Sequence, residues 1–476
     1  MFPASGSSDR QPQVTQRPPN IVARVLDAAV FWGLLVLIPV AVIPYGSADP
    51  WWEAVFECGV FVLAAIAAVE AFFMRRWQLR HGWVLLPLVL LTAFAFLQTV
   101  QWPPSWLMAS KTHYLLTIDR YQTYLTARKM LGLTVFLTLL LSHLSTPRRL
   151  RWTIRAVLAV GIGSALFGIV RQFMQTTDAP AGFVLPFLFY GVGYGEFISP
   201  NPFAYLMELT LGLVAGVLLG GGAGRNRIFV YLAIIAVVWT ALVLSNSRGG
   251  LMALGVEAIF VGFMSLRWFS ERKSMAGERG SRLIVMLRES KAVQIAMIAC
   301  VIIVLACGVF WMGGDQLAEK MGQTTADQNL TDGTTRQEIW GASWKMIKAN
   351  PWTGSGFGAF FLGITQYQTS SGRLRLQQAH NDYLDLAANG GIVSVILAIW
   401  FVAAIWPVAR RRLNSRDPQR RSAALGAATA IIGVAVHSTV DFGLQLTGIA
   451  VVFVAIIAIL IADVRLETRR PHTSST

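Results

Sequence analysis

The segment RIFVYLAIIAVVWTALVLS, residues 227–245, has a single charged side chain, at its first position. Because a bilayer core takes about 20 apolar residues per helix, this run is long enough to cross a membrane. The same window, moved along the rest of the chain, predicts twelve spans. They lie at 26–44, 52–74, 83–100, 122–143, 152–175, 203–221, 227–245, 248–266, 292–312, 383–406, 422–438 and 443–462. We therefore expect an all-α polytopic membrane protein with about twelve transmembrane helices.

The composition excludes a soluble globular protein. Of the 476 residues, 54% are hydrophobic and 14% are charged, whereas a soluble domain carries about 25% charged residues. The three cysteines, Cys58, Cys300 and Cys307, lie in apolar runs. They are too few for a disulfide framework and lack metal-ligand spacing, so they read as small hydrophobic residues.

The net charge of +15, from 40 Lys and Arg against 25 Asp and Glu, would by itself suggest a nucleic-acid partner. However, 28 of the 40 basic residues lie on one side of the predicted spans, at both termini and at alternate junctions. This pattern follows the positive-inside rule and predicts an even number of spans with both termini in the cytoplasm. No nucleic acid is needed to explain the charge. The other twelve basic residues are Lys111, Arg120, Arg128, Lys129, Arg171, Arg248, Lys320, Arg336, Lys345, Lys348, Arg373 and Arg375.

The predicted spans divide the chain into five parts. A polar cytoplasmic leader (1–25) without a clear cleavage site precedes spans one to nine (26–312). An outer loop (313–382) then leads to spans ten to twelve (383–462) and a cytoplasmic tail (463–476). A loop of this length is usually functional or disordered. We expect this loop to be partly helical, because Thr335–Glu338 is a capping-box pattern before an apolar helix face that ends at Asn350-Pro351.

Two basic side chains on the outer side are candidates for contact with an anion. Arg248, in the motif Ser245–Gly250, lies at headgroup level, where its guanidinium suits a phosphate. The alternative is an arginine that snorkels toward lipid headgroups. Arg336 lies in the first turn of the loop helix, where a cation opposes the helix dipole. This indicates a nearby anion or, more simply, a solvated surface arginine.

The polar stretch Gln377–Tyr383 opens span ten, and Asn381 or Asp382 is a candidate helix cap. His380 would then lie at the mouth of the helix, where a histidine can act as a general base. The alternative is a structural histidine bonded to a carbonyl. Asp441, at the last outer junction, is expected to orient a basic group or to cap a turn.

Arginines within the spans have two readings as well. Arg128 and Arg171 are costly in lipid. They would either pair with Glu53 and Glu57, which share one helix face, or hold a phosphate. We predict the following residues as substrate-binding: Arg171, Arg128, Asn381, Asp382, Tyr383, Ser247 and Asp441.

Taken in order, these motifs resemble the O-antigen ligase and polymerase superfamily of polytopic glycosyltransferases. The matching stretches are Leu244–Gly250, Thr335–Trp340 with Asn350–Gly358, His380–Leu384 with Gly390-Gly391, and His437–Phe442. Each motif is weak alone, but the ordered set together with the twelve spans is fairly specific. The first half of the chain matches only in topology.

The resemblance implies transfer of a glycan from undecaprenyl diphosphate to lipid A–core at the periplasmic face of the bacterial inner membrane. It implies catalytic roles for Arg248, Arg336 and His380, with no metal and no cofactor. The sequence agrees with that expectation, since it contains no D-x-D pair and no Cys/His cluster.

Three alternatives stay open. An O-antigen polymerase and a protein O-oligosaccharyltransferase share the superfamily motifs. The chain ends about 14 residues after the last predicted span, which favours a ligase over protein-transferring members. A lipid or solute transporter also has many spans, but the sequence shows no matching pair of broken half-helices.

Overall fold

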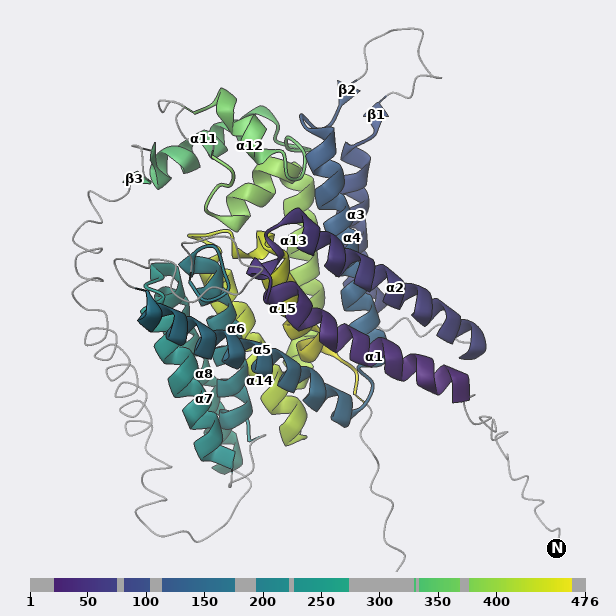
Figure 1. Ribbon diagram of the computed structural model, residues 1–476, viewed down its shortest axis with the longest axis vertical. Helices are drawn as coiled ribbons and strands as arrows, with labels where there is room; N and C mark the ends of the chain where they lie inside the picture. The colour runs from purple at the N-terminus through teal and green to yellow at the C-terminus, as the bar shows by residue number, and fades with distance from the viewer. Residues whose placement is uncertain are drawn as a thin grey trace, which may run out of the picture.

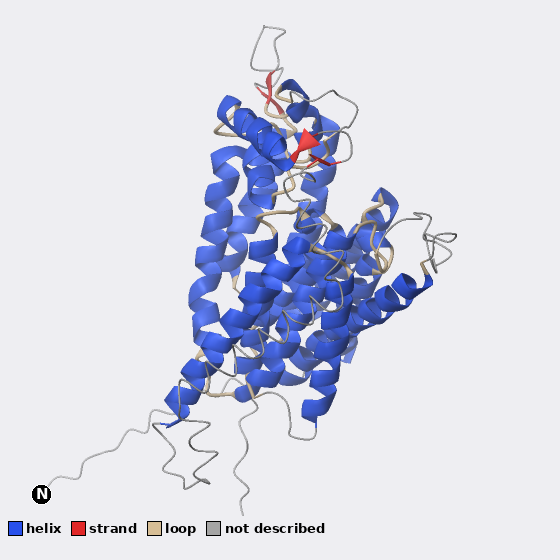
Figure 2. Cartoon of the chain, turned by 90° about the vertical axis from the view of Figure 1, so that its left-hand side faces the viewer, coloured by secondary structure: helices blue, strands red, loops and turns tan. Residues whose placement is uncertain are grey.

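The computed structural model describes residues 21–74, 81–102, 114–175, 194–221, 227–273, 329–330, 334–368 and 376–464. Most of its long helices run side by side in an up-and-down bundle (Figures 1 and 2). These helices are α1 (Ile21–Val42), α2 (Pro50–Met74), α3 (Gly82–Gln98), α4 (Arg120–His143), α5 (Pro147–Met174), α6 (Pro200–Leu219), α7 (Ile228–Leu244), α8 (Arg248–Lys273), α13 (Asp382–Leu413), α14 (Pro418–His437) and α15 (Thr447–Ile461).

Each of these helices coincides with one of the predicted spans. The ninth predicted span, 292–312, lies outside the described residues. By length and composition, seven of the described helices can cross a membrane: α1, α2, α4, α5, α6, α8 and α13. Three more, α3, α7 and α15, are apolar but shorter. The all-helical polytopic class is therefore supported, and the count of twelve spans stays a prediction.

Short elements lie at one end of the bundle. Helices α11 (Arg336–Ala349) and α12 (Phe360–Gly363) cover the start of α13 (Figure 1). Two antiparallel pairs of two-residue strands lie here. Strand β1 (Gln101–Trp102) pairs with β2 (Tyr114–Leu115), and β3 (Asn329–Leu330) pairs with β4 (Thr334–Thr335). Three 3-10 turns, η1 (Tyr45–Ser47), η4 (Ile364–Gln366) and η5 (Gly443–Gln445), complete the described elements. We call this end the outer end, after the orientation that the basic residues predict.

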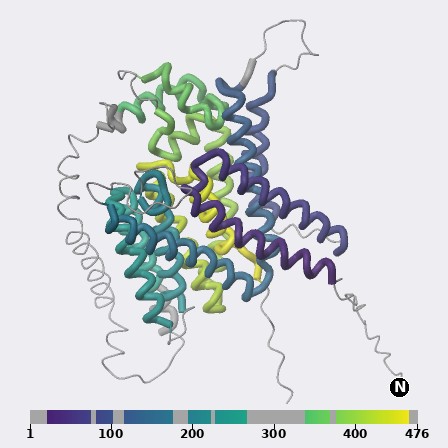
Figure 3. Tube along the Cα trace, viewed as in Figure 1, coloured from purple at the N-terminus to yellow at the C-terminus, as the bar shows by residue number. Residues whose placement is uncertain are grey.

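Helices α6 and α14 cross at backbone contact. A Cβ added to Gly216 would lie 1.9 Å from the Gly426 nitrogen, and one added to Gly212 would lie 2.6 Å from the Ala430 nitrogen. Small residues on facing helices allow such an approach in membranes. The consequence is that the first turns of α6 lie against the last turns of α14, at the outer end. The same core brings α15 next to α1, from opposite ends of the chain (Figure 3).

Helix α13 is broken near its outer end, at Gly391, whose φ and ψ are 59° and −162°. A glycine-rich loop satisfies the freed backbone groups. The amides of Ser355 and Gly356 donate to the carbonyls of Ala388 and Asn389, at 3.0 and 2.9 Å. Buried backbone groups in a membrane need such partners. Positive φ angles at Gly354, Gly356 and Gly358 allow the fit, so this loop packs against a helix.

Candidate active site

The loop before α13 holds His380 in a left-handed conformation, with φ at 48°. Next to it, Asn381 is the N-cap of α13, and its side-chain oxygen accepts from the amides of Tyr383 and Leu384, both at 3.0 Å. This confirms one of the two predicted caps. The cap fixes where the helix begins, and thereby where the His380 side chain leaves the backbone.

His380 lies beside Asp441, which comes from the junction between α14 and α15. Its Nδ1 is 3.7 Å from Asp441 Oδ1, which is within ion-pair range but longer than a hydrogen bond. The Phe442 ring and the imidazole pack edge to face, with centroids 4.9 Å apart. The His380 side chain is 24% exposed and that of Asp441 only 5%. The imidazole is therefore supported on one side by a buried carboxylate and remains reachable.

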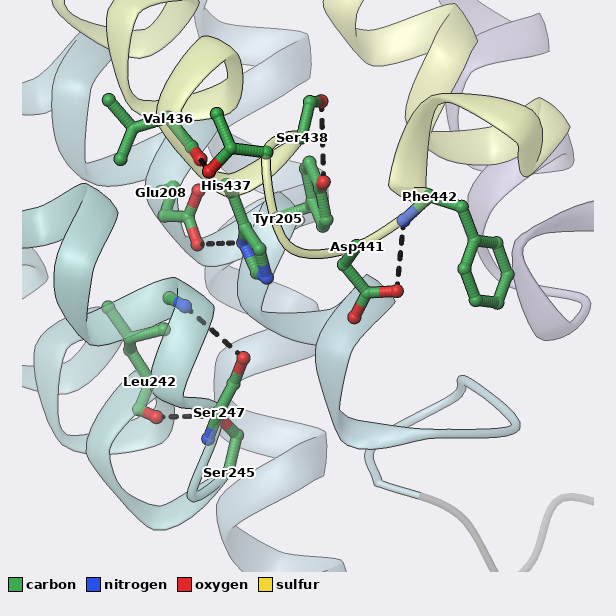
Figure 4. Close-up of polar contacts among 12 residues, drawn as sticks. Tyr205, Glu208, Leu242, Ser245, Ser247, Val436, His437, Ser438, Asp441 and Phe442 are labelled. Atoms are coloured by element: carbon green, nitrogen blue, oxygen red, sulfur yellow. Dashed lines mark hydrogen bonds and ion pairs between the residues drawn. The ribbon is translucent and has the colours of Figure 1, made fainter. Parts of the chain in front are cut away.

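Asp441 is ionised at neutral pH. Burial acts to raise the pKa of its carboxyl, but the nearby His380 and His437 imidazoles and the Phe442 amide outweigh burial, and the pKa lies below its ordinary value. The Phe442 amide donates to Asp441 Oδ1 at 2.9 Å (Figure 4). A fixed negative charge facing Nδ1 favours a proton on that atom and leaves Nε2 as the basic nitrogen.

Residues 435–441 and the start of α13 are tied together. Asp382 donates its amide to the Ser438 carbonyl at 3.0 Å, and its carboxylate accepts from the Ser438 hydroxyl at 2.8 Å. Asn381 donates to the Thr439 carbonyl at 2.8 Å, and the Tyr383 hydroxyl donates to a carbonyl of α14 at 2.7 Å. Two of the predicted motifs are therefore one structural unit.

The Ser245–Gly250 motif forms the turn between α7 and α8, with Asn246 in a left-handed conformation at φ 55°. The Ser247 hydroxyl accepts from the Gly250 amide at 3.2 Å, as a helix cap does. Helix α8 begins at Arg248. The amide-rich start of a helix attracts anions, so Arg248 stands where a phosphate would be stabilised twice, by charge and by the helix end.

Arg336 begins α11, and its side chain lies outside the described residues. Trp340, four residues later and so on the same helix face, donates its indole N–H to the Ala379 carbonyl at 3.1 Å. Ala379 precedes His380. Helix α11 is therefore tied, through Trp340, to the loop that carries His380.

The arginines of the first half make structural contacts. Arg128 forms an ion pair with Glu57, with Nε and Oε2 at 2.5 Å, which is one of the two predicted readings. Lys129 pairs with Glu53 at 3.1 Å. Arg171 is 1% exposed and donates to the Gly195 carbonyl, rather than to either of those carboxylates.

Residues that the sequence did not single out also build this region. Asp385 is buried. It accepts from the Ala379 backbone amide at 3.4 Å and from the Asn389 side-chain amide at 2.6 Å, and so anchors the His380 loop to α13. Tyr205 stacks on His437, with ring centroids 3.9 Å apart. A carboxylate on the fourth residue of a helix and a tyrosine within a span carry no distinct sequence signal.

Among the described residues, one group of side chains has the geometry for a metal ion: Asp27, Glu70 and His143. It lies at the inner end of α1, α2 and α4, at the far end of the bundle from His380. His143 Nε2 contacts Glu70 at 2.9 Å, and Arg149 binds Asp27. This group is separate from the candidate active site.

The apolar helices that are long enough to cross a membrane support a multi-pass membrane protein. Residues 230–399 match the family model described as O-Antigen ligase, and this match supports a member of the O-antigen ligase superfamily. Members of that family are glycosyltransferase-like enzymes, ligases or polymerases. The matched segment contains Arg248, Arg336 and His380, whereas Asp441 lies beyond it. No curated protein matches the chain.

Proposed function

We propose that this protein is an O-antigen ligase of the bacterial inner membrane. It transfers a glycan from undecaprenyl diphosphate to lipid A–core at the periplasmic face. The observation that carries the proposal is the meeting of His380 with the buried carboxylate of Asp441, 3.7 Å away, at the outer end of the bundle. The family match, which covers His380 and both proposed catalytic arginines, supports it further.

In the proposed reaction, His380 Nε2 removes the proton from an acceptor sugar hydroxyl. The hydroxyl oxygen attacks the anomeric carbon of the donor, and the bond between that carbon and the diphosphate oxygen breaks. Undecaprenyl diphosphate leaves with the electron pair, and the anomeric configuration inverts. Ionised Asp441 stabilises the imidazolium that forms, as a carboxylate does in other histidine-based sites.

Arg248 and Arg336 supply the electrostatic part of the proposal. Negative charge grows on the diphosphate as the donor bond breaks, and fixed cations aimed at it lower the barrier. Ser247 caps the turn that carries Arg248. Asn381, Asp382 and Tyr383 bond to residues 435–439 and hold the His380 loop. We propose that these four residues and Arg171 also contact the substrate. Arg128, paired with Glu57, takes the other role that the sequence left open, that of a structural ion pair.

The test is transfer by purified protein from a lipid-linked glycan to lipid A–core, in detergent and without an ion gradient. Product is expected, with unchanged yield in EDTA and without nucleotide. Elongated undecaprenyl-linked glycan with no lipid A–core product would identify a polymerase. Glycan on an added pilin-type protein would identify a protein O-oligosaccharyltransferase.

A deletion strain supplies the matching test in cells. Loss of a ligase should leave long lipid-linked chains and rough lipopolysaccharide, whereas loss of a polymerase should leave single-repeat caps. A strain in which lipid-linked glycan fails to reach the periplasmic face at all would instead indicate a transporter and would contradict the proposal.

A further inference from the structure

A buried histidine, His437, contacts both halves of the candidate site. One half is the turn that carries Arg248, and the other is the His380–Asp441 pair. His437, the last residue of α14, is 1% exposed, and its Nδ1 is 2.7 Å from the carboxylate of Glu208 in α6, which is fully buried. The ring stacks on Tyr205 with an interplanar angle of 9° (Figure 4). Both contacts come from α6, and together they fix the position and the orientation of the imidazole.

The first turn of α8 rests on this pair. A Cβ added to Gly249 would lie 2.4 Å from His437 Nε2 and Cδ2, and one added to Gly250 would lie 3.1 Å from Glu208 Oε1. The backbone can approach so closely only because both residues are glycines. Arg248 precedes them, so the place of its Cα depends on the place of the His437 ring.

The main chain of the same histidine supports the other half of the site. The His437 carbonyl accepts from the amides of Val440 and Asp441, at 2.9 and 3.1 Å. These bonds form the turn that brings Asp441 to His380. His437 therefore contacts the arginine turn through its side chain and the carboxylate turn through its backbone.

We infer that His437, held by Glu208, is a positioning residue that sets the spacing between Arg248 and the His380–Asp441 pair. The inference rests on the proposed function, in which one substrate complex must meet both. A buried pair of this kind is weak evidence for a role in stability, since apolar residues of similar volume often serve as well. Misplacement of reacting groups by about 1 Å, in contrast, costs about 100-fold in rate.

The test is a double-mutant cycle between Gly249 and His437. Gly249→Ala should lower kcat for transfer by about 10- to 100-fold, because the added methyl group displaces the α8 turn. Gly255→Ala is the matched control, the same change in the same helix with nothing within 4 Å of the added atom. It should leave kcat and protein level as in the wild type.

His437→Ala removes the ring and should also lower kcat. In that background Gly249→Ala should cost little more, because the 2.4 Å clash with the ring is gone and only Val440 Cγ2, at 3.0 Å, remains close. The two losses should therefore not multiply. Glu208→Gln keeps an oxygen for the His437 Nδ1–H and should retain most of the activity, whereas Glu208→Leu should not. A role in stability alone would lower the amount of folded protein and leave kcat per folded molecule unchanged.

The outcomes separate the two proposals. Transfer by the wild type, with losses that multiply in the double variant, would overturn the positioning role and leave the proposed function standing. An unchanged kcat in Gly249→Ala would do the same. If the wild type makes no product, the proposed function fails, and the positioning role fails with it.

Discussion

Two contacts between a basic and an acidic side chain differ in their geometry and in their expected role. In the first half of the chain, Arg128 and Glu57 form an ion pair at 2.5 Å, and the carboxylate is 3% exposed. At the outer end of the second half, His380 and Asp441 stand 3.7 Å apart, with the imidazole 24% exposed. The first contact satisfies both charges. The second leaves a basic ring nitrogen available next to a fixed negative charge.

The difference indicates which contact serves catalysis and which serves stability. The Arg128–Glu57 pair joins two regular helices, α4 and α2. The His380–Asp441 contact joins two turns, and His380 takes a left-handed conformation that few non-glycine residues adopt. Strained backbone of this type clusters at functional sites. We therefore expect substitutions at the second contact to change rates and substitutions at the first to change stability.

The largest expected effect is at His380. His380→Ala removes the base and should lower transfer by about 100- to 10,000-fold, measured as product per folded molecule with the purified protein. The matched control is His81→Ala. His81 also has a positive φ, 57°, and begins a helix, but at the inner end of the bundle. Transfer at a near-normal rate by His380→Ala would exclude the role of His380 as base.

The second effect compares the same substitution in the two regions. Arg248→Lys keeps the charge but loses the planar guanidinium, so it should lower kcat/KM for the donor by about 10- to 100-fold. Arg128→Lys, in the closed ion pair, should change donor kinetics by less than about threefold. Equal losses in both variants would indicate that Arg128 also acts on the donor. That result would contradict a structural role for the Arg128–Glu57 pair.

The sequence predicted much of this arrangement because the membrane restricts the choices. Runs of apolar residues mark spans whatever their partners are, and each described long helix coincides with one. The Asn381 cap and the turn at Ser245–Gly250 are local signals, so both could be read from the chain. The family motifs follow one another in the expected order, and the resemblance suggested that they form one site.

The remaining features depend on contacts between distant residues. Glu208 and His437 are 229 residues apart, and Gln98 binds the Thr353 and Asn389 carbonyls from 255 and 291 residues away. None of these three separations produces a periodic pattern in the sequence. The sequence also left open whether Arg128 binds a carboxylate or a phosphate, because burial and distance determine its partner. The break at Gly391 was missed because its partner loop lies elsewhere in the sequence.

The third prediction tests the closed contact directly. Glu57→Gln removes the anion that pairs with Arg128 and should lower the free energy of unfolding by about 1–2 kcal/mol, less than for a fully buried pair because Arg128 is 35% exposed. Thermal unfolding in detergent measures it. Arg128→Met combined with Glu57→Leu should restore stability, and kcat of the folded protein should stay unchanged. A large drop in kcat in either variant would contradict a purely structural pair.

The smallest effect concerns a third acidic group, Glu196, which precedes α6 and accepts a hydrogen bond from the Ser164 hydroxyl. Burial raises its pKa from 4.5 to about 7, against the opposing effects of that hydroxyl and of Arg171. Between these two values the folded protein keeps a proton that the unfolded chain has lost. Stability should therefore fall as the pH rises through this range, by about 1 kcal/mol between pH 6 and pH 7. Glu196→Gln cannot titrate, so its thermal stability should lack this component while transfer continues. If wild type and variant lose stability in parallel over that interval, Glu196 is already ionised in the folded protein. Its charge would then be compensated by its surroundings, as the charge of Glu57 is compensated by Arg128.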